Sequence, residues 1–196
     1  SYRDEARAQK KIPPSLPQFL LDVKQWYPPL YGLVLSVIPD FIFRYTNCIT
    51  LLLSLARLLL VYVFVISLGT QVTPLIYLLT LIYISAPILV YYDNQINARV
   101  FGALLLDSLI LFWYVYFTFN NIATIVPIVF VSIAMLYTHK MSHQLYLFLL
   151  VGISICYFDP IPLGTYLFAV TLASLFFGYR KYAIAHIEIV KFWHRN

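Results

Sequence analysis

The chain has 196 residues, of which 62% are hydrophobic and only 11% are charged, and its formal net charge is +5. A soluble domain carries about 25% charged residues, so this composition excludes an ordinary water-soluble domain, a disordered chain and a collagen-like chain. We expect an integral membrane protein made mostly of spanning helices. Its basic residues flank apolar segments, which suits anionic lipid headgroups as partners and argues against nucleic acid.

Residues 1–46 are predicted to form an N-terminal tail with interfacial helices. Ser15 and Gln18 form a capping-box pattern before Phe19–Trp26, which predicts a short amphipathic helix on the membrane surface. The next apolar run, Leu30–Phe43, has about 14 residues, whereas a helix needs about 20 to cross the hydrocarbon core. We therefore expect an interfacial or re-entrant helix there rather than a further span.

Six apolar runs follow and predict an all-α fold, with a six-helix transmembrane bundle over residues 47–179. The runs are continuous, so they lack the alternation of barrel strands. Most approach the length of about 20 residues that a crossing helix needs. The fifth is shorter, so it requires a locally thinner membrane or neighbouring segments that complete the crossing. The runs are Cys48–Leu68, Thr73–Tyr92, Val100–Phe119, Ile122–Thr138, His143–Phe158 and Ile161–Tyr179.

The basic residues orient this six-span arrangement. Its loop and tail Lys and Arg all fall on one side, which receives the N-terminal region, the 93–99 and 139–142 loops and a basic, aromatic interfacial tail at 180–196. The turns on the opposite side contain no Lys or Arg. By the positive-inside rule, both termini should face the cytosol in the endoplasmic reticulum, or the matrix in the mitochondrial inner membrane.

Two charged residues fall inside the predicted spans. Arg57 lies nine residues after Cys48 in the first span, and Asp107 lies seven residues after Val100 in the third. Both spans start on the same side, so a rise of 1.5 Å per residue places both residues roughly 10–14 Å deep. An unpaired charge there would cost roughly 3 kcal/mol or more. We expect Arg57 and Asp107 to pair, either as a polar site open to the inner leaflet or as a structural ion pair.

No metal, cofactor or catalytic set is predicted. His139 and His143 are four residues apart, a spacing that could hold a metal on a helix, but no glutamate follows the first and no third ligand is near. We expect them to lie in a solvated loop, and His186 and His194 to lie in the tail. The sequence has no glycine-rich phosphate loop, no Ser–His–Asp constellation and no Cys-x-x-Cys.

Two short stretches carry a more specific pattern. The first span opens NCITLLLSLAR from Asn47 to Arg57, and a later stretch reads NQINARVFGA from Asn94, followed by three leucines and Asp107. These stretches resemble the CDP-alcohol phosphatidyltransferases, six-span enzymes of phospholipid synthesis with an amphipathic N-terminal helix. Their first span opens Asn-x-x-Thr-x-x-Arg, and their third opens with a Phe-Gly-Ala-x-Leu-Asp-like stretch after an Ala-Arg pair. The resemblance implies a vestigial lipid-headgroup site. Its residues would be Asp93, Asn94, Arg99 and Gly102.

The departures from that family concern its metal site. The family signature is D-x2-D-G-x2-A-R-x8-G-x3-D-x3-D, whose aspartates bind divalent metal and activate the alcohol. Alignment of its second glycine with Gly102 places the last two aspartate positions at Leu106 and Ile110, and the first two also fall on non-acidic residues. Asp107 misses its position by one residue, about 100° of helix rotation. The resemblance therefore implies a divergent member that has lost its metal site.

Our leading hypothesis is a non-catalytic integral membrane protein, either a phosphatidyltransferase-like pseudoenzyme or an accessory, lipid-binding subunit of a larger membrane complex. Its partners would be phospholipids and other membrane subunits. One alternative is an active CDP-alcohol phosphotransferase with an unusual site lined by Asp107, Asp93 and Arg99. Another is a membrane-shaping protein of the endoplasmic reticulum, with Phe19–Trp26 and Leu30–Phe43 as its wedge.

Overall fold

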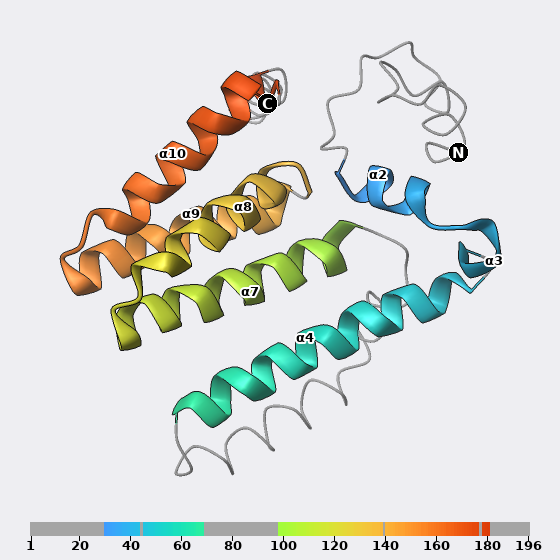
Figure 1. The fold of residues 1–196 in the computed structure, drawn as a ribbon, viewed down its shortest axis with the longest axis horizontal. Helices are drawn as coiled ribbons and strands as arrows, with labels where there is room; N and C mark the ends of the chain where they lie inside the picture. The colour runs from blue at the N-terminus through green and yellow to red at the C-terminus, as the bar shows by residue number, and fades with distance from the viewer. Residues whose placement is uncertain (1–29, 44, 69–97, 139, 177, 181–196) are drawn as a thin grey trace, which may run out of the picture.

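The computed structural model describes residues 30–43, 45–68, 98–138, 140–176 and 178–180. These residues form seven α-helices and one 3-10 turn, with no strand among them, which confirms the all-α class (Figure 1). The predicted helix at 19–26, the second predicted span at 73–92 and the tail beyond Arg180 lie outside the described residues. The elements are α2 (Leu30–Val37), α3 (Asp40–Phe43), α4 (Thr46–Leu68), α7 (Ala98–Phe119), η2 (Ile122–Thr124), α8 (Ile125–Leu136), α9 (Lys140–Tyr157) and α10 (Ile161–Phe176).

Two of these helices are long and apolar enough to cross a membrane. They are α4, over the 20 residues Cys48–Ser67, and α7, over its 22 residues. The helices that follow are apolar but shorter. The fourth expected run begins as the turn η2, whose start is capped by the Asn121 side chain accepting from the Ala123 N–H. Six membrane crossings remain a prediction.

Helices α4 and α7 run parallel to each other. Arg57 of α4 contacts Asp107 of α7, and seven residues further along each helix the rings of Phe64 and Tyr114 meet at 5.2 Å. Because both contacts advance in the same direction, the end of α4 and the start of α7 lie at opposite ends of the bundle. A return crossing between them is what the six-span prediction requires, and residues 69–97 fall outside the described part of the chain.

The helices alternate in direction from α7 to α10, so that α4, α7 and α9 start at the end where α8 and α10 finish (Figure 1). We call this end the basic end, because Arg99 lies in the first turn of α7, Lys140 begins α9 and Arg180 follows α10. The described turns at the opposite end, 120–124 and 158–160, contain Asp159 and no Lys or Arg. Among the described residues, these three basic residues therefore lie at one end of the bundle, and the side of the membrane that this end faces remains a prediction.

The predicted single run Leu30–Phe43 is two short helices, α2 and α3, separated at Pro39. Proline ends a helix because it has no N–H to donate and its ring clashes with the preceding turn. The Leu30 N–H donates to the Tyr137 carbonyl after α8 at 2.9 Å, and the buried Tyr31 ring lies 5.9 Å from the ring of Phe101. Helix α2 is thus attached to the basic end, and neither short helix is long enough to cross a bilayer.

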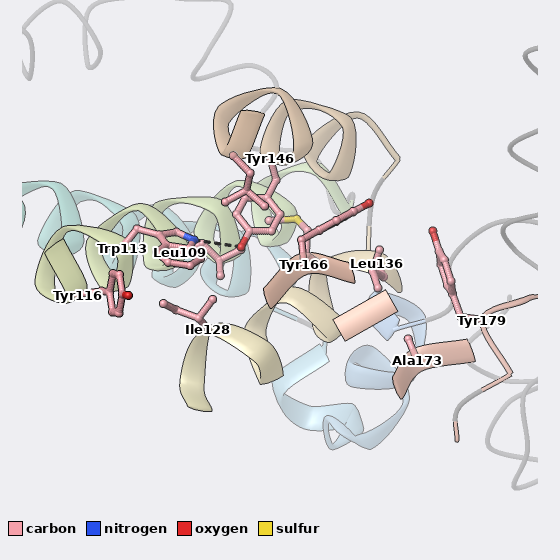
Figure 2. Close-up of a cluster of buried hydrophobic side chains, with 11 residues drawn as sticks. Leu109, Trp113, Tyr116, Ile128, Leu136, Tyr146, Tyr166, Ala173 and Tyr179 are labelled. Atoms are coloured by element: carbon pink, nitrogen blue, oxygen red, sulfur yellow. Dashed lines mark hydrogen bonds between the residues drawn. The ribbon is translucent and has the colours of Figure 1, made fainter. Parts of the chain in front are cut away.

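The core lies among α7, α8, α9 and α10 (Figure 2). Leu109, Trp113 and Tyr116 are spaced four and three residues apart along α7, which places them on one face of the helix. They pack with Ile128 of α8, Tyr146 of α9 and buried residues of α10. Among the described helices, α4 contributes no residue to this cluster and packs mainly against α7.

Candidate functional site

The Arg57–Asp107 contact is the centre of the candidate site. The Arg57 Nε donates to Asp107 Oδ2 at 2.8 Å, across the interface between α4 and α7. The two side chains are 20% and 19% exposed. The structure therefore brings together the two charges that the sequence places at equal depth, and each charge is balanced by the other.

Polar groups extend from this ion pair along the same face of α4. Thr50 and Ser54 precede Arg57 by seven and three residues, which is the spacing of one helix face. Thr50 is fully buried. Beyond Arg57, the Tyr114 hydroxyl donates to the Ser67 carbonyl at 2.8 Å and closes the interface at its other end. The ion pair and the Tyr114–Ser67 hydrogen bond therefore join α4 and α7 at two points.

Of the residues of the predicted vestigial headgroup site, the structure describes Arg99 and Gly102. Asp93 and Asn94 lie outside the described residues. Arg99 is exposed at the basic end, eight residues before Asp107, which is about 12 Å along the axis of α7. Gly102 is buried in the same helix. Within the described ranges, no three His, Cys, Asp or Glu residues are grouped so that they could hold a metal ion.

The prediction that His143 lies in a solvated loop is wrong. Helix α9 begins at Lys140, three residues earlier than expected, so His143 shares a helix face with Tyr146 and Leu150, both fully buried. His143 Nε2 forms a hydrogen bond with the Tyr166 hydroxyl of α10, and the two rings stack at 5.7 Å. The spacing of three and seven residues was the signal in the sequence that could have indicated this packing. His139 lies outside the described residues, as do His186 and His194.

A second polar group that the sequence analysis missed lies inside the core. The Trp113 Nε1 donates to the Tyr146 hydroxyl at 3.2 Å (Figure 2). This hydroxyl shares a further hydrogen bond with Ser132 Oγ at 3.0 Å. All three residues are at most 1% exposed. Buried indole and phenol groups need hydrogen-bond partners. Here the side chains of α7, α8 and α9 supply those partners to one another. The group therefore specifies how three helices pack.

No protein-family model, no curated protein and no solved structure matches this chain. The likeness to CDP-alcohol phosphatidyltransferases therefore depends on its two short stretches, and it remains a hypothesis. The alternative of an active CDP-alcohol phosphotransferase is tested by metal-dependent turnover of a CDP-lipid by the purified protein. Loss of that turnover in Asp107→Asn would establish this alternative, and absence of metal binding would reject it.

Proposed function

We propose that the chain is a non-catalytic integral membrane protein that serves as a lipid-contacting, structural subunit of a larger membrane assembly. The observation that carries this proposal is that polar side chains bond between the helices, whereas large apolar side chains are exposed on their outward faces. In the described helices, Arg57, Asp107, Trp113 and Tyr146 bond across helix interfaces. Most of the large side chains exposed on the same helices are apolar.

Helix α4 shows this distribution most clearly. Arg57 turns toward α7, whereas large apolar side chains on the rest of the helix are exposed by 41% to 64%. An exposed apolar surface along a whole helix suits lipid or another membrane helix as its neighbour. The exposed residues are Leu51, Leu52, Leu55, Leu59, Val61, Tyr62, Val63 and Ile66.

The proposal includes six spans with both termini on the side of the basic end. Cysteine accessibility in sealed vesicles tests it, with Asn121→Cys and Arg180→Cys placed in a background where Cys48 and Cys156 are serine. A membrane-impermeant thiol reagent should label the two positions from opposite sides. Labelling of both from the same side would contradict the arrangement.

The assembly itself is tested by native purification in mild detergent after cross-linking in the membrane. We expect the chain to migrate in a complex much larger than its own mass of 22.8 kDa. Recovery of free monomer alone, with and without cross-linker, would refute the role as a subunit. Extraction by alkaline carbonate would refute the membrane placement as well.

Membrane shaping is the second candidate function, and the corner between α2 and α3 favours it. Val37 and Phe41 are 80% and 69% exposed there, while the Leu30–Tyr137 hydrogen bond holds α2 to the basic end. Apolar side chains held at the headgroup level can wedge one leaflet apart. Tubulation of liposomes by the wild type, lost in Phe41→Ser, would support this function, and unchanged liposomes would argue against it.

A further inference from the structure

The three helices that follow α7 are shorter than the hydrocarbon core of a bilayer. The apolar parts of η2 with α8, of α9 and of α10 each have between 10 and 17 residues. At a rise of 1.5 Å per residue, the 16 residues of α10 extend over about 24 Å, whereas the core is about 30 Å thick. The 22 residues of α7 extend over about 33 Å and cover the full thickness. One side of the bundle is therefore about 6 Å shorter than the core.

The basic end places these helices at the headgroups of one leaflet. Arg180 follows α10 and is exposed, and a basic side chain beyond the end of an apolar helix belongs at the membrane surface. Helix α2, which is too short to cross the core, is joined to the residue after α8 by the hydrogen bond from the Leu30 N–H to the Tyr137 carbonyl. The missing length of about 6 Å therefore falls at the opposite end, which we call the Asp159 end.

The two turns of the Asp159 end expose large apolar side chains. Phe119 and Ile122, on either side of the first turn, are 66% and 79% exposed, and Phe158 of the second turn is 92% exposed. The turns are neighbours, because the ring of Phe117 near the end of α7 stacks on the ring of Tyr157 at the end of α9, with 4.4 Å between their centroids. Aromatic and aliphatic side chains exposed together at this level suit the boundary between acyl chains and headgroups.

Polar groups in the same turns oppose burial of this end in the hydrocarbon. The Asn121 side chain accepts from the Ala123 N–H at 3.1 Å, and Asp159 Oδ1 accepts from the Ile161 N–H at 2.9 Å. Both hydrogen bonds are exposed, and the carboxylate has further lone pairs that need water or headgroups. A short helix can be accommodated by a thinner bilayer or by turns that lie below the headgroups. The polar groups of these turns favour the thinner bilayer.

We propose that helices α8, α9 and α10 thin the bilayer locally, by drawing the phospholipid headgroups of the leaflet at the Asp159 end about 6 Å inward. This proposal depends on the membrane placement in the proposed function, and it is independent of the larger assembly. It concerns the leaflet opposite to the one that a wedge at α2 and α3 would enter. Around α4 and α7 the bilayer keeps its ordinary thickness, because their apolar lengths are 20 and 22 residues.

The test uses the full chain reconstituted in vesicles of two phosphatidylcholines that differ in chain length. X-ray scattering measures the spacing between the two phosphate layers as the protein content of the vesicles increases. In oleoyl phosphatidylcholine, with a core of about 30 Å, we expect this spacing to decrease as protein is added, toward a local decrease of about 6 Å. In myristoleoyl phosphatidylcholine, the shorter chains bring the core close to the length of α10, about 24 Å, and we expect the spacing to stay constant.

A series of lysine variants identifies the leaflet that is thinned. Ile122, Val126 and Phe130 follow one another at intervals of four residues and are 60% to 79% exposed. Ile122→Lys places its charge among the lowered headgroups, so the amount of folded protein in the membrane should equal that of the wild type. Phe130→Lys places the charge about 12 Å further along the helix, in the hydrocarbon, and should reduce that amount at least about tenfold, with Val126→Lys between the two. Phe130→Leu is the matched control for loss of the ring and should leave the amount unchanged.

Three results would overturn the proposal. They are a constant phosphate spacing in oleoyl phosphatidylcholine, an equal decrease of the spacing in both lipids, and an Ile122→Lys variant as damaging as Phe130→Lys, which would place the turns of the Asp159 end in the hydrocarbon. Carbonate extraction is read in parallel. A wild type that stays in the membrane without thinning it rejects only the thinning, whereas a wild type that carbonate extracts rejects the proposed function too.

Discussion

Removal of one partner of the Arg57–Asp107 pair should destabilise the protein more than removal of both. Two unit charges about 4 Å apart attract by about 4 kcal/mol at an effective dielectric constant of 20. Loss of one partner from a buried pair costs about 3–5 kcal/mol, and exposed pairs are worth at most about 1 kcal/mol. Because both side chains are about one-fifth exposed, we expect Arg57→Leu and Asp107→Leu each to lower the free energy of unfolding by about 2–3 kcal/mol.

The double variant Arg57→Leu/Asp107→Leu should cost less than either single variant, because it leaves no uncompensated charge between α4 and α7. The assay is a double-mutant cycle, in which helicity is followed while SDS is titrated into mixed micelles. Ser108→Ala is the matched control beside the pair, since the Ser108 hydroxyl donates only within its own helix, to the Leu104 carbonyl. Additive effects of the two single variants, with a coupling below about 0.5 kcal/mol, would refute the ion pair as the tie between these helices.

Three further predictions use the same unfolding assay. Burial raises the pKa of Tyr31 to about 12, whereas the unfolded residue titrates near 10. The contribution of Tyr31 to stability should therefore be lost between about pH 10 and 12, and Tyr31→Phe should make the fall in stability over that range smaller. The Tyr31 hydroxyl has no hydrogen-bond partner among the described residues, so Tyr31→Phe should not destabilise the protein at pH 7. Tyr146→Phe should cost about 2 kcal/mol, because it removes the bonds of two buried partners, and a cost equal to that of Tyr157→Phe, at an exposed position, would contradict this. Gly178→Ala should cost about 1 kcal/mol, since its φ of +67° is left-handed, and an unchanged midpoint would count against that strain.

The pairing of Arg57 with Asp107 could be predicted from the sequence, because the depth of a residue in a span follows from its number of residues from the start of the span. Arg57 and Asp107 lie at similar distances from the same ends of their spans, and a charge in an apolar segment needs a partner. His143 could not be assigned in the same way, because its environment depends on where α9 begins and on which face meets Tyr166. A shift of three residues in a helix start turns a solvated histidine into a packed one.

The core hydrogen bonds among Trp113, Ser132 and Tyr146 illustrate the same limit. Each residue occupies a position of its own helix that is compatible with a core, and periodicity along one helix carries no information about the rotation of another. The break at Pro39 is the reverse case. The proline alone ends α2, but the Tyr137 carbonyl that accepts from the Leu30 N–H of α2 is more than 90 residues away in the chain. The sequence analysis treated Leu30–Phe43 as one run although Pro39 is a local signal for the break, and only packing supplied the contact with Tyr137.

Composition, apolar run length and the positions of a few charges determined by themselves that this chain is helical and apolar, with basic residues at one end of the helices. These properties follow from local quantities, namely the number of consecutive apolar residues and the cost of a charge among them. The tertiary structure alone decided which faces meet: the parallel packing of α4 on α7, the stacking of His143 on Tyr166 and the burial of Tyr146. Such contacts depend on the relative rotation and register of distant helices, and therefore on the energy of the whole packed bundle.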